Sequence, residues 1–278
     1  MIYDIFFPSQ ELGSIVKQYV VLSSLEGVEK LLFLPNGCNF IVFNRGIDGY
    51  TELYNENNKF SIPKKYSVSV KTNKVEKFVL SEESDSTSIT FPIILAELTP
   101  IGYYQLFNKQ ASSLNCNYEE LEDSIIDSYF KDLYLHNSIE EEIEYLNSSL
   151  VLLKNLQNIP HLPIYDVIDK IANSYHYEVT VKNLVNEFGC SRSTMEREFK
   201  KVVGLTPKNF IFVSKFCKTV LSYIQDKRSF KELEYLYSDS SHMNSVFKKF
   251  LGVCPTVMLN EVANNNIQIY QLHKPKAI

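Results

Sequence analysis

The chain has 278 residues, of which 45% are hydrophobic and 13% aromatic, which is enough for two ordinary domains and excludes an intrinsically disordered protein. No apolar run reaches the roughly 18 residues of a membrane span, and the N-terminus lacks the pattern of a signal peptide, so we expect no membrane segment and a cytoplasmic location. Residues 1–162 carry 12 Lys and Arg against 22 Asp and Glu, whereas residues 163–278 carry 16 against 11, so only the second part would be attracted to a polyphosphate.

Residues 1–110 are predicted to form mostly short β-strands. Apolar runs at 31–34 and 38–44 flank the turn Pro35-Asn36-Gly37, and Asn-Gly is a strong hairpin signal because both residues accept a positive φ. Further strand-like runs follow at 50–54, 59–62, 66–72, 77–80 and 88–91. Regularly spaced short strands with turn residues between them predict a small barrel or sandwich.

After Pro100 the pattern changes to helices, which are predicted at 102–107, 117–130 and 138–157. In the third helix, apolar residues recur at three- and four-residue steps, at Ile143, Leu146, Leu150 and Leu153. This stripe would form either the seam of a homodimer or a cover for the chain's own barrel. Residues 111–158 are therefore interpreted as a dimerisation or cover part, and two prolines indicate a linker at 159–163.

The second part contains an internal repeat. The segment FKKVVGLTP at 199–207 recurs 48 residues later as FKKFLGVCP at 247–255, and Met195 and Met243 match at the same offset. Five identities in nine positions, including a glycine and a proline, indicate a duplicated unit.

Each unit has the pattern of a helix-turn-helix. In the first unit, Thr180 is a predicted N-cap for a helix over 181–188, and Gly189 ends that helix with a sharp turn. Ser191 is a predicted N-cap for a second helix over 192–203, whose Met195, Phe199 and Val202 would share one inner face. A short helix, a turn and a second helix with an apolar inner stripe are typical of the motif.

The second helix of such a motif fits the major groove, where its first outward residues reach base edges and later cations contact phosphates. In the first unit the predicted base-reading residues are Arg192, Ser193, Glu196 and Arg197, and the predicted phosphate contacts are Lys200 and Lys201. In the second unit the corresponding residues are Ser240, Ser241 and Asn244, with Lys248 and Lys249 at phosphates. The alternative is that these are ordinary surface charges, which the duplication and the turn glycine disfavour.

At these positions the sequence resembles the AraC/XylS family of transcription regulators. The matching residues of the first unit are Leu184, Val185, Gly189, Ser191, Met195, Arg197, Phe199 and Lys200. Those of the second unit are Tyr237, Asp239, Ser241, His242, Met243, Phe247, Lys248, Gly252 and Pro255. The resemblance implies a DNA-binding domain at 164–262, in which a long helix over 207–225 joins two helix-turn-helix subdomains, and a C-terminal tail at 263–278.

The second unit departs from the family pattern. Leu236 stands where the family has its turn glycine, Ser245 replaces the arginine that corresponds to Arg197, and the segment 229–239 is two residues short for a first helix. We therefore expect weaker base reading by this unit and a structural or phosphate-facing role for His242.

The run LPNG followed by CNFIVFNRG also looks like the sensor domain of one AraC-like subgroup, in which a hairpin opens a cupin-like barrel. The combined resemblance implies an α+β two-domain fold. Its N-terminal domain is a small cupin-like β-barrel or sandwich with flanking helices, with residues 1–110 as the sensor part, and its C-terminal domain is an all-α double helix-turn-helix. The partners implied are promoter DNA, a small-molecule effector in the barrel and a second copy of the chain.

Motifs for enzymatic chemistry are absent from the sequence. The five histidines have no metal-ligand spacing, the five cysteines form no CxxC pair, and no nucleotide-binding or hydrolase motif is present. We therefore expect no metal, no cofactor, no catalytic residue and free, mostly buried thiols. Two alternatives stay open. One is a small-molecule enzyme with a helical appendage, and the other is an interaction module whose second unit docks a partner such as RNA polymerase.

Overall fold

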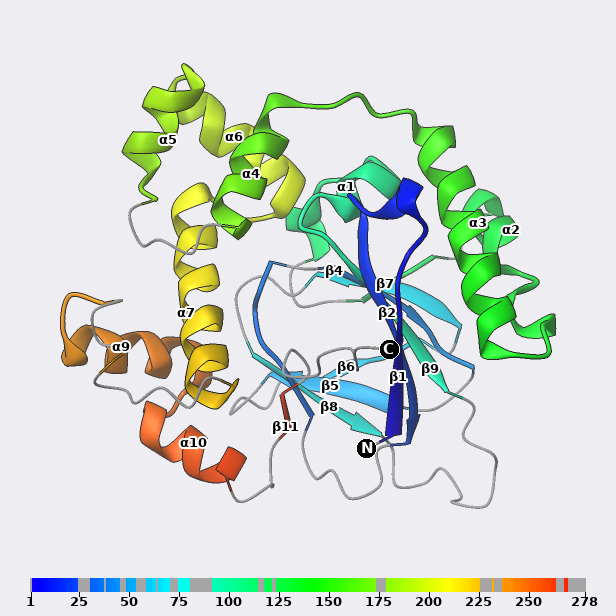
Figure 1. Ribbon diagram of the computed structural model, residues 1–278, viewed down its shortest axis with the longest axis horizontal. Coiled ribbons are helices and arrows are strands. Elements are labelled where there is room, and N and C mark those ends of the chain that lie inside the picture. The colour runs from blue at the N-terminus through cyan, green and yellow to red at the C-terminus, as the bar shows by residue number, and fades with distance from the viewer. Residues whose placement is uncertain are drawn as a thin grey trace.

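The computed structural model describes residues 2–24, 31–37, 39–45, 49–53, 59–63, 65–70, 75–80, 92–114, 118–121, 124–173, 179–225, 232, 237–263 and 268–269. The N-terminal part is built on two sheets (Figure 1). The first sheet has, in spatial order, β1 (Ile2–Phe6), β2 (Val16–Ser24), β9 (Ile93–Leu98), β4 (Asn39–Phe43), β7 (Tyr66–Val70) and β10 (Tyr118–Glu120). The second has β11 (Gln268–Ile269), β3 (Leu31–Phe33), β8 (Glu76–Leu80), β5 (Gly49–Leu53) and β6 (Lys59–Ser61).

Among the described strands every pairing is antiparallel except that of β11 with β3, which is parallel. An apolar cluster joins the facing sides of the two sheets, with Val20, Phe40 and Leu95 from the first sheet and Leu31 and Phe33 from the second. We call this cluster the inter-sheet core. Alternate residues of each strand enter it because side chains of a strand point to opposite faces in turn.

The outer face of the first sheet is covered by helices. These are α1 (Gly102–Phe107), α2 (Ser124–Phe130) and α3 (Ile139–Gln157), together with the short 3-10 turns η1 (Gln10–Leu12), η2 (Ala111–Leu114) and η3 (Leu133–Leu135). Helix α3 begins where the Ser138 hydroxyl accepts a hydrogen bond from the backbone N–H of Glu141 at 3.2 Å, and it ends at Asn158 in the left-handed conformation.

The predicted dimer stripe faces this sheet. Ile143, Leu146, Leu150 and Leu153 are at most 5% exposed and belong to one cluster with Ile41 of β4. The stripe is therefore not available to a partner chain, and of its two interpretations the structure shows the cover. The physical reason is that the outer face of the sheet is itself apolar and needs a helix to bury it.

The C-terminal part is helical. Its described helices are α4 (Pro163–Asn173), α5 (Val181–Phe188), α6 (Arg192–Val203), α7 (Pro207–Gln225), α9 (Ser240–Leu251) and α10 (Pro255–Ala263). An antiparallel β region followed by a helical helix-turn-helix region confirms the predicted fold class.

Two local expectations for the N-terminal part are wrong. The strands flanking Pro35-Asn36-Gly37 do not form a hairpin, because β3 pairs with β8 and β11 while β4 pairs with β7 and β9. Gly37 does adopt a positive φ of 74°, but its turn carries the chain from one sheet to the other. Within the predicted helix over 117–130, Tyr118–Glu120 form strand β10 because the edge of β7 is available for pairing, and the described helical residues are those of α2. The predicted strand at 88–91 and the first helix of the second unit lie outside the described residues, apart from Glu232 and 237–239 of the latter.

The two parts share one core. The cluster of the helical part also contains Leu32, Leu34 and Tyr104 from the N-terminal part, beside Phe199 and Phe210. Two glycines allow close approach at this boundary. A Cβ at Gly37 would collide with the Phe210 ring, and a Cβ at Gly204 would lie 3.0 Å from the carbonyl carbon of Ala111.

Candidate DNA-binding surface

The first helix-turn-helix is fixed by three local features. The Thr180 hydroxyl accepts a hydrogen bond from the backbone N–H of Asn183 at 3.2 Å and starts α5. Gly189, with a φ of 60°, ends α5 in the left-handed region that favours glycine. The Ser191 hydroxyl then accepts from the backbone N–H of Thr194 at 3.1 Å and starts α6. All three features agree with the sequence prediction.

The inner face of α6 packs on the core of the helical part. Met195, Phe199 and Val202 are at most 1% exposed, and the Phe199 ring lies 5.4 Å from that of Phe210 at the start of α7. This burial fixes the rotation of α6 about its axis. The opposite face of the helix is therefore held toward solvent.

The outer face of α6 begins with exposed polar side chains at Arg192, Ser193 and Arg197. Each arginine is paired within the helix, Arg192 Nε with Glu196 Oε1 at 2.8 Å and Arg197 Nε with Glu198 Oε1 at 3.0 Å. Ion pairs this exposed contribute only about 0–1 kcal/mol. A nucleic acid can therefore replace the glutamates as partner of both guanidinium groups.

The two lysines in the last turn of α6 differ from each other. Lys200 is exposed, whereas Lys201 lies against the N-terminal part, with its Nζ 5.0 Å from the centre of the Tyr104 ring on α1. A hydrogen bond to the Tyr104 hydroxyl raises the pKa of Lys201. Contact with a phosphate would require Lys201 to leave Tyr104, a constraint the sequence does not reveal because α1 is distant in the chain.

Helix α9 repeats the geometry of α6. The Asp239 carboxylate accepts a hydrogen bond from the backbone N–H of His242 at 2.7 Å at the start of α9, in the place that Ser191 takes in the first unit. Met243 and Phe247 are buried in the places of Met195 and Phe199. Both helices end at a left-handed glycine, Gly204 and Gly252, so the sequence repeat corresponds to a structural repeat.

The exposed face of α9 has shorter side chains than that of α6. Its predicted groove residues Ser240, Ser241 and Asn244 are exposed, and so is Lys248. Ser245, in the place of Arg197, donates a hydrogen bond from its hydroxyl to the Ser241 carbonyl oxygen at 2.9 Å. The Nζ of Lys249 lies 4.9 Å from the centre of the Phe212 ring. This face therefore reaches less far into a groove than that of α6.

His242 has contacts that a structural residue would have. Its Nδ1 lies 3.1 Å from the Ser238 hydroxyl, and its ring stacks on Phe212 with centroids 6.5 Å apart. These contacts connect the start of α9 to α7. In Figure 1, α6 and α9 lie near opposite ends of α7, which joins the two units.

The stability that the Asp239 cap gives to α9 is expected to depend on pH. The hydrogen bond from the backbone N–H of His242 lowers the pKa of Asp239 below its usual value. Because the folded pKa is depressed, the cap stabilises α9 fully above the unfolded pKa of about 4 and is lost as the pH falls through the folded value. The Tm of the wild type should therefore exceed that of Asp239→Asn by a constant amount down to about pH 4, and the two Tm values should converge below that pH. A constant difference between the two down to pH 2 would contradict this assignment.

We also searched the described residues for metal ligands, membrane-spanning helices and reactive thiols. No group of three or more His, Cys, Asp and Glu side chains there could hold a metal ion, and none of the described helices is long and apolar enough to cross a membrane. Cys190, Cys217 and Cys254 are free thiols, and burial raises the pKa of Cys217 to about 12. Cys38 and Cys116 lie outside the described residues.

The comparisons with known proteins include a family model that matches the helix-turn-helix region. The model of a family described as a helix-turn-helix domain matches residues 184–261. A search of curated proteins gives no match. Among solved structures, the chain is similar to an apo variant of ToxT from Vibrio cholerae strain SCE256, with 13% identity over 93% of this chain and 96% of that chain and a TM-score of 0.44.

Two further solved structures are similar to the chain. One is wild-type ToxT from the same strain bound to an unsaturated fatty acid, with 13% identity over 93% of this chain and 94% of that chain and a TM-score of 0.41. The other is the AraC-like transcriptional activator CuxR, with 13% identity over 84% of this chain and 91% of that chain and a TM-score of 0.29.

The fold and the duplicated motif define a protein with a helix-turn-helix domain, the motif whose second helix enters the major groove of DNA. That domain covers residues 184–261, within the region where the sequence resembles the AraC/XylS family.

Proposed function

We propose that the chain reads promoter sequence through the first two turns of α6 and uses α9 mainly to hold the DNA backbone. The observation that carries this proposal is the contrast between the two faces of α6. Its inner face is at most 1% exposed at Met195, Phe199 and Val202, while its outer face presents Arg192, Ser193 and Arg197 to solvent. A helix held in this way can place its outer side chains in a groove without rearranging its core.

The proposed roles follow from side-chain chemistry. Arg192 and Arg197 have the planar donor pair that binds the O6 and N7 atoms of guanine, and Ser193 and Glu196 are further base-reading candidates. On α9, Ser240, Ser241 and Asn244 can donate to or accept from base edges but have less reach. Lys200, Lys248 and Lys249 are exposed cations for phosphates, although Lys249 also lies over the Phe212 ring, and Lys201 would join them after leaving Tyr104.

The proposal is tested by selecting preferred sites for the full chain from a random-sequence DNA pool and then measuring affinities. Arg197→Ala should cost about 1–3 kcal/mol on the preferred site and relax the preference at the base pairs it contacts. Arg197→Lys should lose most of the same preference, because it keeps the charge but not the donor pair.

Lys200→Ala is the matched control. It should weaken binding to all sequences alike and reduce the slope of log affinity against log salt by about 1. A wild-type chain that shows no sequence preference at moderate salt would instead favour an interaction module, in which α9 docks a protein such as RNA polymerase.

We further propose that the chain forms a homodimer through the solvent face of α3. Leu152 and Leu156 lie one turn apart on this face and are 57% and 54% exposed, so a second copy could bury both. Leu152→Asp should shift sedimentation velocity profiles toward the monomer. Leu135→Asp, which alters an even more exposed leucine on η3, should leave them unchanged. A monomeric wild type at high micromolar concentration would rule out this interface.

We also propose that the N-terminal part responds to an effector. A small-molecule effector would bind in the N-terminal part and change how the helical part meets DNA. We place the protein in the cytoplasm, where promoter DNA is accessible, and assign no enzymatic step to it.

A further inference from the structure

Strand β3 has one face in each of the two parts of the molecule. Leu31 and Phe33 belong to the inter-sheet core, whereas Leu32 and the following residue Leu34 belong to the core of the helical part. The alternation of side chains along a strand makes this arrangement possible. Elsewhere in the described part of the sheets, β2, β4 and β9 also contribute to the inter-sheet core, but their other faces pack under α1, α2 and α3.

The backbone of β3 is also bonded to both parts. On one side it pairs with β8 of the N-terminal part. On the other it pairs with β11, which follows the helix-turn-helix domain in the chain, with Ile269 opposite Leu32. Ile269 is fully buried and belongs to the core of the helical part. A displacement of β3 would therefore move hydrogen-bonded neighbours in both parts.

A series of contacts continues from β3 to the DNA-binding surface. After Leu34 the chain turns at Gly37, whose backbone lies so close to the Phe210 ring that a side chain there would collide with it. Phe210 in turn packs against Phe199 on the inner face of α6, at 5.4 Å between ring centres. Packed aromatic rings transmit displacement because interiors are close-packed and have little free volume.

We propose that β3 and its following turn couple the inter-sheet core to the position of α6. A molecule that entered the inter-sheet core would move Phe33, and β3 would carry this displacement through Leu34 and Gly37 to Phe210 and Phe199. The regulatory meaning of this coupling rests on the proposed function, but the coupling itself is a property of the free protein.

The test compares two substitutions that remove the same contact. The rings of Phe33 and Phe40 meet edge to face at 5.6 Å in the inter-sheet core, but Phe40 lies on β4, whose other face packs under the helices of the N-terminal part. Amide hydrogen exchange of the full chain is measured without DNA for Phe33→Leu and Phe40→Leu. Phe33→Leu should raise exchange rates in α6 and in the first turns of α7 by about tenfold, and Phe40→Leu should leave them unchanged.

The reverse effect supplies a second measurement. Because coupling between two sites is reciprocal, Phe210→Leu should raise exchange rates in β8, the neighbour of β3. Equal effects of Phe33→Leu and Phe40→Leu on α6, or no effect of either, would overturn the proposal. A wild type that binds no DNA would refute the proposed function, whereas the exchange result would still decide the coupling.

Discussion

Replacing Phe199 by alanine is expected to lower the free energy of unfolding by about 3–5 kcal/mol. The side chain is fully buried and packs on Phe210, and both belong to the core that the two parts share. A loss of this size is a large fraction of the roughly 5–15 kcal/mol that stabilises a typical domain. Denaturant titration of the full chain measures it directly, and binding to the selected DNA should fall with it because the orientation of α6 depends on this contact.

Phe247→Ala is the matched variant in the second unit. Phe247 is also fully buried, with its ring 5.2 Å from that of Phe216, so the stability cost should be similar. Its effect on sequence preference should be smaller, since α9 presents Ser245 where α6 presents Arg197. If Phe199→Ala were as stable as the wild type, the inner face of α6 would not be held as described. If both variants lost DNA sequence preference equally, the unequal roles of the two helices would be contradicted.

Local signals explain why the helix-turn-helix region could be predicted closely from the sequence. The bounds of α5 and α6 match the predicted ranges because each start and end is set by residues within a few positions, such as Ser191 and Gly204. The repeat at a 48-residue offset then placed α9 by analogy with α6. Capping and turn chemistry act over one helical turn, so a single sequence contains them in full.

Non-local pairing explains what the sequence did not reveal. The turn at Gly37 carried a correct conformational signal, but only the positions of β8 and β9 decide that the flanking strands enter different sheets. The apolar stripe of α3 was correctly placed on one face, yet periodicity alone does not say whether that face meets a sheet or a second chain. The contact of Lys201 with Tyr104 likewise depends on the docking of the two parts.

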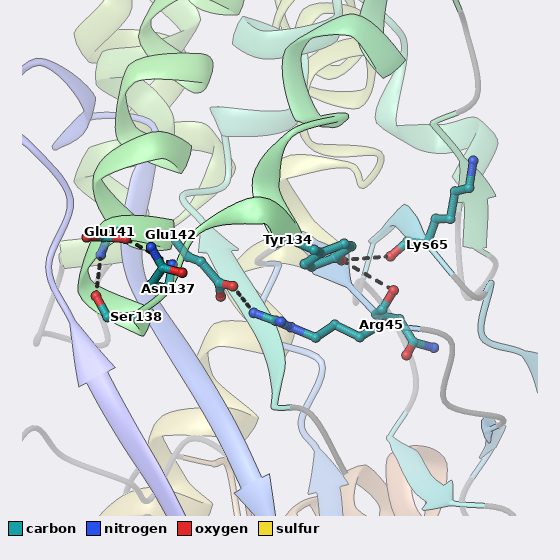
Figure 2. Close-up of polar contacts among 8 residues, drawn as sticks. Arg45, Lys65, Tyr134, Asn137, Ser138, Glu141 and Glu142 are labelled. Carbon is teal, nitrogen blue, oxygen red and sulfur yellow. Dashed lines mark hydrogen bonds and ion pairs between the residues drawn. The ribbon is translucent and has the colours of Figure 1, made fainter. Parts of the chain in front are cut away.

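Removing the carboxylate of Glu142 is expected to cost about 3–5 kcal/mol of stability, because it breaks a largely buried ion pair with the guanidinium of Arg45. Figure 2 shows Arg45, two residues after the end of β4, reaching Glu142 in the first turn of α3. The side chains are 13% and 2% exposed, and desolvation lowers the pKa of Arg45. The Tyr134 ring lies 4.7 Å from the guanidinium carbon, and its hydroxyl donates to the Asn44 carbonyl oxygen at 3.3 Å. Chemical denaturation of Glu142→Ala measures the loss.

A double substitution separates the cost of breaking the pair from the net contribution of the pair to stability. Arg45→Met with Glu142→Leu removes both charges while keeping most of the volume, and it should be neutral or stabilising by about 1–4 kcal/mol relative to the wild type. If the double variant were as unstable as Glu142→Ala, the attraction between the two charges would exceed the free-energy cost of removing them from water.

In either case, α3 of Glu142→Ala should detach from β4 before the rest of the fold opens, because the ion pair connects the first turn of α3 to the sheet. Amide exchange confined at first to α3 in that variant is therefore the expected sign of this connection, and uniform exchange across α3 and α6 would contradict it.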